Sequence, residues 1–212
     1  MQGLGGNSGS SYGIYTDTGA NIIGQSTATG DLTFIADSYY LSALNIQTAG
    51  TINLKPLTPG KTIGIKGGAG DISFTDASFF NFIDPTVTPS KFVFGDSNTG
   101  NVTANAQTWN SNLELVSGLG NIVFNGAQTL GNHTLLATTA STGDIVFEAS
   151  GSITSTAIND AVVLASGRDF LNNAGEIALS TPSDRWLVYS TDPTSTSFEP
   201  KVQSERLIYL RN

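Results

Sequence analysis

Gly120-Asn-Ile-Val-Phe124 and Gly143-Asp-Ile-Val-Phe147 are two copies of a short sequence that decides the fold of this 212-residue chain. Each copy consists of a glycine, a small polar residue, a β-branched residue or leucine, a spacer, and then Phe, Leu or Ala. Four earlier copies begin at Gly30, Gly50, Gly70 and Gly100. Successive glycines are 20, 20, 30, 20 and 23 residues apart, and a period of this length indicates a solenoid of stacked repeats.

Each copy is predicted to form a turn followed by a half-buried strand, because glycine accepts the bend and apolar residues alternate with polar ones. A second set of short apolar runs lies between the copies, at residues 41–46, 61–65, 91–94, 112–116, 133–137 and 161–165. No stretch shows a helical period with caps, so we expect almost no helix. The prediction is an all-β, parallel, right-handed β-helix solenoid of about 8–9 coils, roughly 40 Å long.

Three segments are expected along the chain. Residues 1–13 are a flexible Gly/Ser-rich lead, residues 14–193 form the β-helix, and residues 194–212 form a C-terminal cap or a linker to a following domain. Two apolar positions of the repeat are predicted to face inward as continuous stacks. The first stack contains Leu32, Ile52, Ile72, Val102, Ile122 and Ile145, and the second contains Phe34, Leu54, Phe74, Ala104, Phe124 and Phe147. Ala104 is small where its equivalents are large, so either a loop residue fills that space or the rod narrows there.

The interval from Gly70 to Gly100 is ten residues longer than most others and contains Asp76–Pro89. Two prolines and three phenylalanines in this stretch, Phe79, Phe80 and Phe82, do not continue a plain coil. The phenylalanines could seat an excursion loop against the rod, and insertions in solenoids often lie on the binding face. The alternative is an irregular coil in which they are ordinary core residues.

The composition excludes several classes of function. With 39% hydrophobic residues the chain can build a sizeable core, so general disorder is excluded. Only 12% of residues are charged and the net charge is −8, which disfavours binding to nucleic acids and to anionic membranes. There is no cysteine, and no apolar run approaches the ~20 residues that span a bilayer. Residues 1–10 lack the features of a signal peptide, so we expect any export signal to have been removed or to lie outside this sequence.

The sequence offers no convincing catalytic, cofactor or metal site. The single histidine, His133, has no acidic residue near it in sequence and is interpreted as a corner residue. Gly67-Gly-Ala-Gly-Asp71 has the composition of a calcium-binding repeat, but its aspartate is misplaced and no tandem copy follows. Asp31, Asp71 and Asp144 share the position after the repeat glycine. Other copies have Thr or Asn there, which favours turn chemistry over paired catalytic carboxylates.

Residues 165–193 resemble the segment that ends the β-helical region in large bacterial exoproteins of the filamentous-haemagglutinin type. The resemblance lies in Phe170 and Asn172-Asn-Ala-Gly175, then Arg185-Trp-Leu-Val-Tyr-Ser190 and Asp192-Pro193. The upstream repeats are similar to this family only in pattern. Here residues 197–210 replace the usual glycine-rich continuation, and the N-terminal secretion motifs of the family are absent. The resemblance implies a C-terminal part of the helical shaft, with Arg185, Trp186 and Tyr189 in a cap over the last coil.

The resemblance further implies export to the bacterial cell surface and a role in adhesion. We therefore expect a non-catalytic structural or adhesive shaft segment without cofactors. Its expected partners are proteins or glycans on host or neighbouring cells. One alternative is a carbohydrate-binding or carbohydrate-cleaving β-helix protein, which as an enzyme would place two carboxylates within about 5–10 Å in a groove. A second alternative is a filament subunit that self-associates through its end strands.

Overall fold

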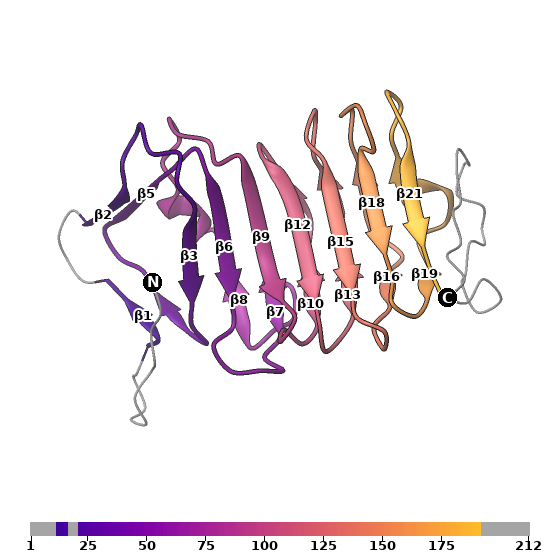
Figure 1. Cartoon of the computed structure of the whole chain (residues 1–212), viewed down its shortest axis with the longest axis horizontal. Helices are drawn as coiled ribbons and strands as arrows, with labels where there is room; N and C mark the ends of the chain where they lie inside the picture. Colours follow the sequence, from indigo (N-terminus) through magenta and orange to yellow (C-terminus); the bar gives the residue numbers. More distant parts are fainter. Residues whose placement is uncertain (1–11, 17–20, 192–212) are drawn as a thin grey trace.

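The computed structural model describes residues 12–16 and 21–191, which form an elongated rod of stacked turns (Figure 1). All strand pairings are parallel, so the predicted all-β solenoid is confirmed. Helix in the described part is limited to two 3₁₀ turns, η1 (Phe80–Phe82) and η2 (Gly175–Ile177), as expected. Residues 1–11 of the expected lead and the whole of residues 194–212 lie outside the described residues.

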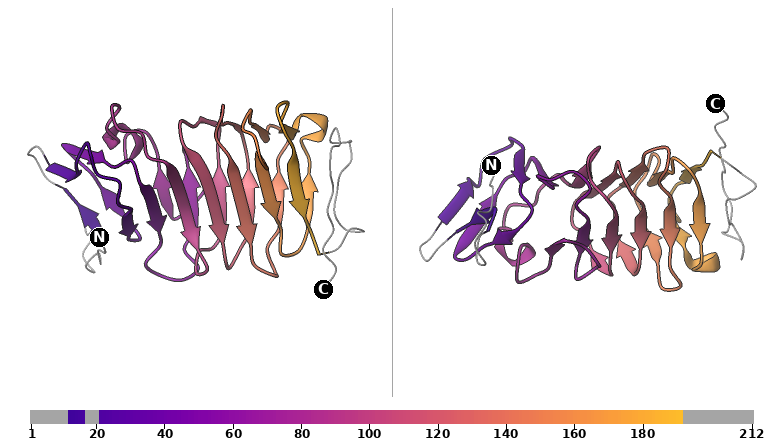
Figure 2. Two further views of the ribbon diagram at one scale, coloured as in Figure 1. Left: turned by 45° about the horizontal axis from the view of Figure 1, so that its top comes forward. Right: turned by 90° about the horizontal axis from the view of Figure 1, so that it is seen from below.

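The strands of successive turns lie side by side along the rod (Figure 2), and the regular turns in its C-terminal part have three sides. The first side is a seven-stranded sheet of β3 (Leu32–Ile35), β6 (Thr51–Lys55), β9 (Lys91–Asp96), β12 (Asn112–Ser117), β15 (Leu135–Thr139), β18 (Val162–Ala165) and β21 (Trp186–Tyr189). The second side contains β8 (Ile72–Phe74), β7 (Ile63–Ile65), β10 (Val102–Ala104), β13 (Ile122–Phe124), β16 (Ile145–Phe147) and β19 (Phe170–Asn172). The third side contains β11 (Gln107–Thr108), β14 (Ala127–Thr129), β17 (Ser152–Thr154) and β20 (Leu179–Ser180). At the N-terminal end, β1 (Ile14–Tyr15) pairs with β4 (Tyr39–Tyr40), and β2 (Asn21–Gly24) with β5 (Leu44–Gln47).

One turn is longer than the others because it carries two strands on the second side. Ile52 of β6 pairs with Phe92 of β9, 40 positions later, whereas other neighbouring pairs on the first side are 20–27 positions apart. The long turn runs through β7 and then β8, which are adjacent although only residues 66–71 connect them. A Cβ atom at Gly64 would lie 1.9 Å from the backbone oxygen of Gly68, so this tight connection requires glycine. Because of the long turn, the first side has seven strands where 8–9 coils were expected.

The six copies of the repeat lie on two different sides of the solenoid, which corrects the prediction of continuous stacks. The copies at Gly30 and Gly50 lead into β3 and β6 on the first side, and the four later copies lead into strands of the second side. The stack that contains Ile52 therefore continues through Phe92 and not through Ile72. The same pattern serves at both corners because each corner is followed by a strand that buries alternate residues.

The inward direction of the apolar positions is confirmed, although Leu32 is only half-buried. The side chains of the three sides meet in one core along the rod axis. Phenylalanines of successive turns lie in contact: the rings of Phe124 and Phe147 are stacked with centroids 4.8 Å apart. Ala104 is fully buried between Ile65 and Phe124 of the adjoining turns.

Candidate functional site

The third side of the solenoid is interrupted between β5 and β11. Ile83 forms one isolated parallel bridge with Ile46 of β5, and the N–H of Asp84 donates to the carbonyl of Ile46 at 2.9 Å. Pro85 and Pro89 follow, and neither has an N–H with which to pair to the next strand. Within the described part, β11 therefore pairs with β14 alone, and its other edge is left without a neighbouring strand.

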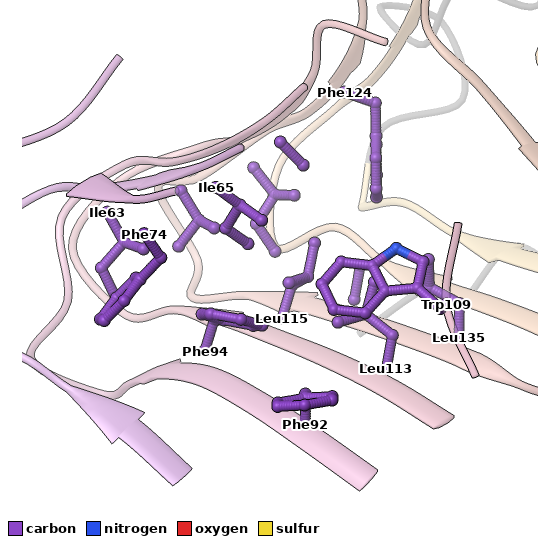
Figure 3. Close-up of a cluster of buried hydrophobic side chains, with 14 of the residues drawn as sticks. Ile63, Ile65, Phe74, Phe92, Phe94, Trp109, Leu113, Leu115, Phe124 and Leu135 are labelled. Atoms are coloured by element: carbon purple, nitrogen blue, oxygen red, sulfur yellow. The ribbon is translucent and has the colours of Figure 1, made fainter. Parts of the chain in front are cut away.

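A cleft of about 200 Å³ occupies this interruption. Segment 80–92 forms one wall and segment 107–111 forms the other. The aromatic cluster in Figure 3 contributes Phe92 and Trp109 to the lining, and their ring centroids are 5.8 Å apart. The full set of lining residues is Phe80, Ile83, Asp84, Pro85, Thr88, Pro89, Phe92, Gln107, Thr108, Trp109, Asn110 and Ser111.

The phenylalanines of the predicted insertion contribute to the core. Phe79 is fully buried and packs edge-to-face against Phe34 and Phe74, with centroids 5.9 and 5.4 Å away. Phe80 is half-buried, packs against Trp109 at 6.0 Å and also lines the cleft. Of the two interpretations of this segment, core packing is correct for Phe79, and the segment closes the long turn.

Asp84 is the one charged residue in the lining of this cleft, and its carboxylate is fully engaged. The hydroxyl and N–H of Thr86 donate to one oxygen, while the side-chain amides of Asn45 and Gln47 donate to the other at 2.8 and 2.7 Å. These hydrogen bonds, first that of the Thr86 hydroxyl, hold the pKa of Asp84 well below its usual range. Asp84 is 8% exposed, so it is a fixed anion that anchors the segment rather than a proton-transfer group.

Several uncharged polar side chains line the cleft without a hydrogen-bond partner in the described part of the chain. The side-chain amides of Gln107 and Asn110 and the hydroxyls of Thr88 and Thr108 belong to this group. The hydroxyl of Ser111 also belongs to it, although Ser111 is only 2% exposed. The residue as a whole is buried, but its hydroxyl oxygen faces the cleft and is not among the buried unpaired side-chain atoms of the described residues, so the Ser111 hydroxyl is available to a ligand.

A second, shallower cleft of about 510 Å³ adjoins the first and shares Gln107 and Thr108 with it. It extends over Ala127 and Thr129 of β14 and reaches the ion pair between Lys66 and Asp76. A third cleft of about 370 Å³ lies near the C-terminal end, between residues 138–139, 165–167 and 189–191. Each of these three clefts contains at most one carboxylate.

The polar position after the repeat glycine forms hydrogen bonds between turns. The side-chain oxygen of Asn101 accepts from the N–H of Asn121 at 2.8 Å, and that of Asn121 accepts from the N–H of Asp144 at 2.8 Å. Asp144 accepts from the N–H of Asp169 at 3.1 Å in turn. Asp31 bonds the next turn at Thr51 N–H in the same way, at 2.7 Å. The predicted local turn chemistry is therefore wrong in its partner, because these four side chains bond the following turn. The side chain of Asp71 differs and bonds Thr62, nine residues earlier.

The three aspartates of this position are not brought together. Asp31 lies at a corner of the first side, and Asp71 binds the N–H and hydroxyl of Thr62 at 3.0 Å each. Asp144 forms an ion pair with Arg168, whose hydrogen bond is the main reason that the pKa of Asp144 is lowered. None of the three lines any of the clefts described above.

His133 and the Gly67–Asp71 stretch contribute to the fold and not to a site. His133 lies in the corner between β14 and β15, and its N–H donates to the Leu130 carbonyl at 3.0 Å. In the Gly67–Asp71 stretch, a Cβ atom at Gly68 would lie 2.2 Å from the Thr103 carbonyl oxygen, so close packing accounts for the glycines. The part of the chain that the structure covers holds no cluster of three or more potential metal ligands.

The residues expected to cap the rod belong to its last regular turn. Trp186 is 4% exposed and pairs with Val162 within the first side. Tyr189 pairs with Ala165 in the same strand, β21, and Arg185 forms an ion pair with Asp160. A cap is not confirmed by this arrangement.

Three exposed tyrosines cluster at the N-terminal end. Tyr15 of β1 and Tyr40 of β4 are cross-strand partners with rings 5.3 Å apart and nearly parallel, and Tyr12 lies 5.0 Å from Tyr40. The three are 41–54% exposed.

Comparison with known proteins does not identify a relative: no family model, curated protein sequence or solved structure matches the chain. Among the residues that the structure describes, no helix has the length and apolar character needed to cross a membrane.

Proposed function

We propose that the chain is a non-catalytic segment of the β-helical shaft of a large exported bacterial surface protein, with a structural or adhesive role. In the filamentous-haemagglutinin-like arrangement proposed here, the helix is right-handed and the protein is displayed outside the cell. Its partners are proteins or glycans on host or neighbouring cells. It binds neither nucleic acid nor cofactor, and residues 194–212 lead to a cap or a following domain.

The observation that carries this proposal is the use of polar side chains at the corners. Asn101, Asn121 and Asp144 hold successive turns together, and the core is continuous along the rod. A rod of turns that each contact mainly their neighbours suits a spacer that presents binding surfaces along its length. The carboxylates of Asp31, Asp71, Asp84 and Asp144 are engaged in hydrogen bonds or ion pairs, and none of the three clefts contains the carboxylate pair of a glycoside hydrolase.

The first experiment separates the shaft from an enzyme. The purified chain, coupled to fluorescent beads, is incubated with bacterial and animal cells, and in parallel with soluble polysaccharides in an assay for released reducing ends or unsaturated sugars. We expect cell binding without product formation. Product formation that Asp144→Asn abolishes, with the fold retained by circular dichroism, would refute the non-catalytic proposal.

A second measurement addresses self-assembly. Light scattering over a wide range of protein concentration is expected to give one molar mass, because the proposed shaft role needs no association between copies of the chain. Scattering that rises with concentration would favour the filament alternative.

A further inference from the structure

We infer that the cleft between segment 80–92 and β11 is a binding site for one ring of a neutral glycan. The inference deepens the adhesive role proposed above and rests on it. The site exists because Pro85 and Pro89 prevent the third side from closing.

The charges at the site argue for an uncharged ligand. Asp84 contributes a permanent negative charge, and the chain as a whole carries a net charge of −8, so phosphate, sulfate and carboxylate groups are repelled. A cation is not favoured either, because all four acceptor positions of the Asp84 carboxylate already receive donors from Thr86, Asn45 and Gln47. A ligand rich in hydroxyl groups can interact with this cleft without adding charge.

The free polar groups match such a ligand. Gln107 and Asn110 each offer an amide that donates and accepts, and Ser111 offers a hydroxyl that can do both. The Ser111 hydroxyl opens to the cleft and has no partner among the described residues, so the site contains a hydrogen-bonding group that a ligand can use. Phe80 and Phe92 provide apolar surface for the C–H face of a sugar ring.

The dimensions limit what enters. A volume of about 200 Å³ is below the ~300–1,000 Å³ of pockets for drug-sized ligands, which fits one ring rather than a large ligand. The shallower cleft shares Gln107 and Thr108 with this site and continues over Ala127 and Thr129. A short oligosaccharide can therefore place one ring in the deep cleft while its neighbouring rings lie across β11 and β14.

The test uses short neutral oligosaccharides of glucose, galactose, mannose or N-acetylglucosamine, together with their sulfated forms, on an array and then by titration calorimetry. Ser111→Ala is the decisive variant: the Ser111 hydroxyl has no partner among the described residues, so its removal is expected to leave the fold intact. We expect binding to a neutral oligosaccharide, weakened about tenfold by Ser111→Ala and by Asn110→Ala, since a lost hydrogen bond costs about 1.4 kcal/mol. Ser152→Ala on β17 is the matched control and is expected to bind like the wild type.

The inference is overturned if no neutral oligosaccharide binds, if sulfated forms bind more tightly, or if both cleft variants bind like the wild type. The bead assay on cells keeps this result separate from the proposed function. Cell binding that persists in Ser111→Ala and Asn110→Ala, and that the array-selected oligosaccharide does not inhibit, would reject the glycan site and leave the adhesive role standing.

Discussion

Replacement of Phe147 by alanine tests whether the stacked core holds the turns together. Phe147 is fully buried in β16, stacked on Phe124 at 4.8 Å and edge-to-face with Phe170 at 5.6 Å. Buried Phe→Ala substitutions cost about 3–5 kcal/mol, and each aromatic pair adds about 0.5–1.5 kcal/mol beyond the area buried. Because two such pairs are lost, we expect a cost near the upper end, about 4–5 kcal/mol. A domain has about 5–15 kcal/mol of stability in total, so the variant should be close to unfolding.

The assay is equilibrium unfolding in urea, followed by far-ultraviolet circular dichroism and by tryptophan fluorescence. Coincidence of the two transitions checks the two-state assumption, which repeat proteins do not always satisfy. Val146→Ala is the control: its side chain lies next in sequence but faces outward and is half-buried, so we expect a loss below about 1 kcal/mol. A loss for Phe147→Ala no larger than that for Val146→Ala would refute the stacked-core argument.

Three further predictions concern the corners and the N-terminal end. The pKa values of Asp84 and Asp144 are lowered by hydrogen bonds from Thr86 and Arg168, so the stability they contribute is present above about pH 4 and is lost as the pH falls through their folded-state pKa. An unchanged urea midpoint between pH 5 and pH 3 would contradict this. Gly118→Ala should lower the free energy of unfolding by about 1–3 kcal/mol, because its Cβ would lie 2.0 Å from a backbone oxygen of the preceding turn. Gly30→Ala is the control: its Cβ would meet no atom within 4 Å, so its stability in the same urea titration should equal that of the wild type. Tyr40→Ala should lower the melting temperature through lost ring stacking worth about 0.5–1.5 kcal/mol, and an unchanged temperature would show that the exposed cluster does not stabilise the N-terminal turns.

The sequence predicts the solenoid because its signals are local. Glycine followed by alternating apolar residues is sufficient to place strands such as Ile122–Phe124 and Ile145–Phe147 and to orient their side chains inward. The pattern does not indicate which side of the turn a copy occupies, because the corners before the first and the second side both need a glycine followed by alternating apolar residues. The four strands β11, β14, β17 and β20 of the third side could not be predicted: they are two or three residues long, and in β14 the single inward residue is Gln128, which gives no apolar signal.

The cleft was only partly accessible from the sequence. Pro85 and Pro89 indicated that the regular coil is interrupted, and the phenylalanines indicated that the segment is anchored to the rod. The opposite wall, formed by Trp109, Asn110 and Ser111, could not be predicted, because its position beside segment 80–92 depends on the register in which the turns stack. The unused hydroxyl of Ser111 is visible only once its surroundings are known.

The hydrogen bonds from corner to corner have a consequence for the length of the rod. The N–H of Asn121 donates to the side-chain oxygen of Asn101, and the side-chain oxygen of Asn121 accepts from the N–H of Asp144, so this turn presents the same connections at its upper and lower faces. Removal of one such unit would leave Asn101 facing the N–H of Asp144, and insertion of another would repeat the existing contact. Gene segments that encode single turns can therefore be gained or lost in evolution without changes to the neighbouring turns. The number of such segments then sets the length of the rod.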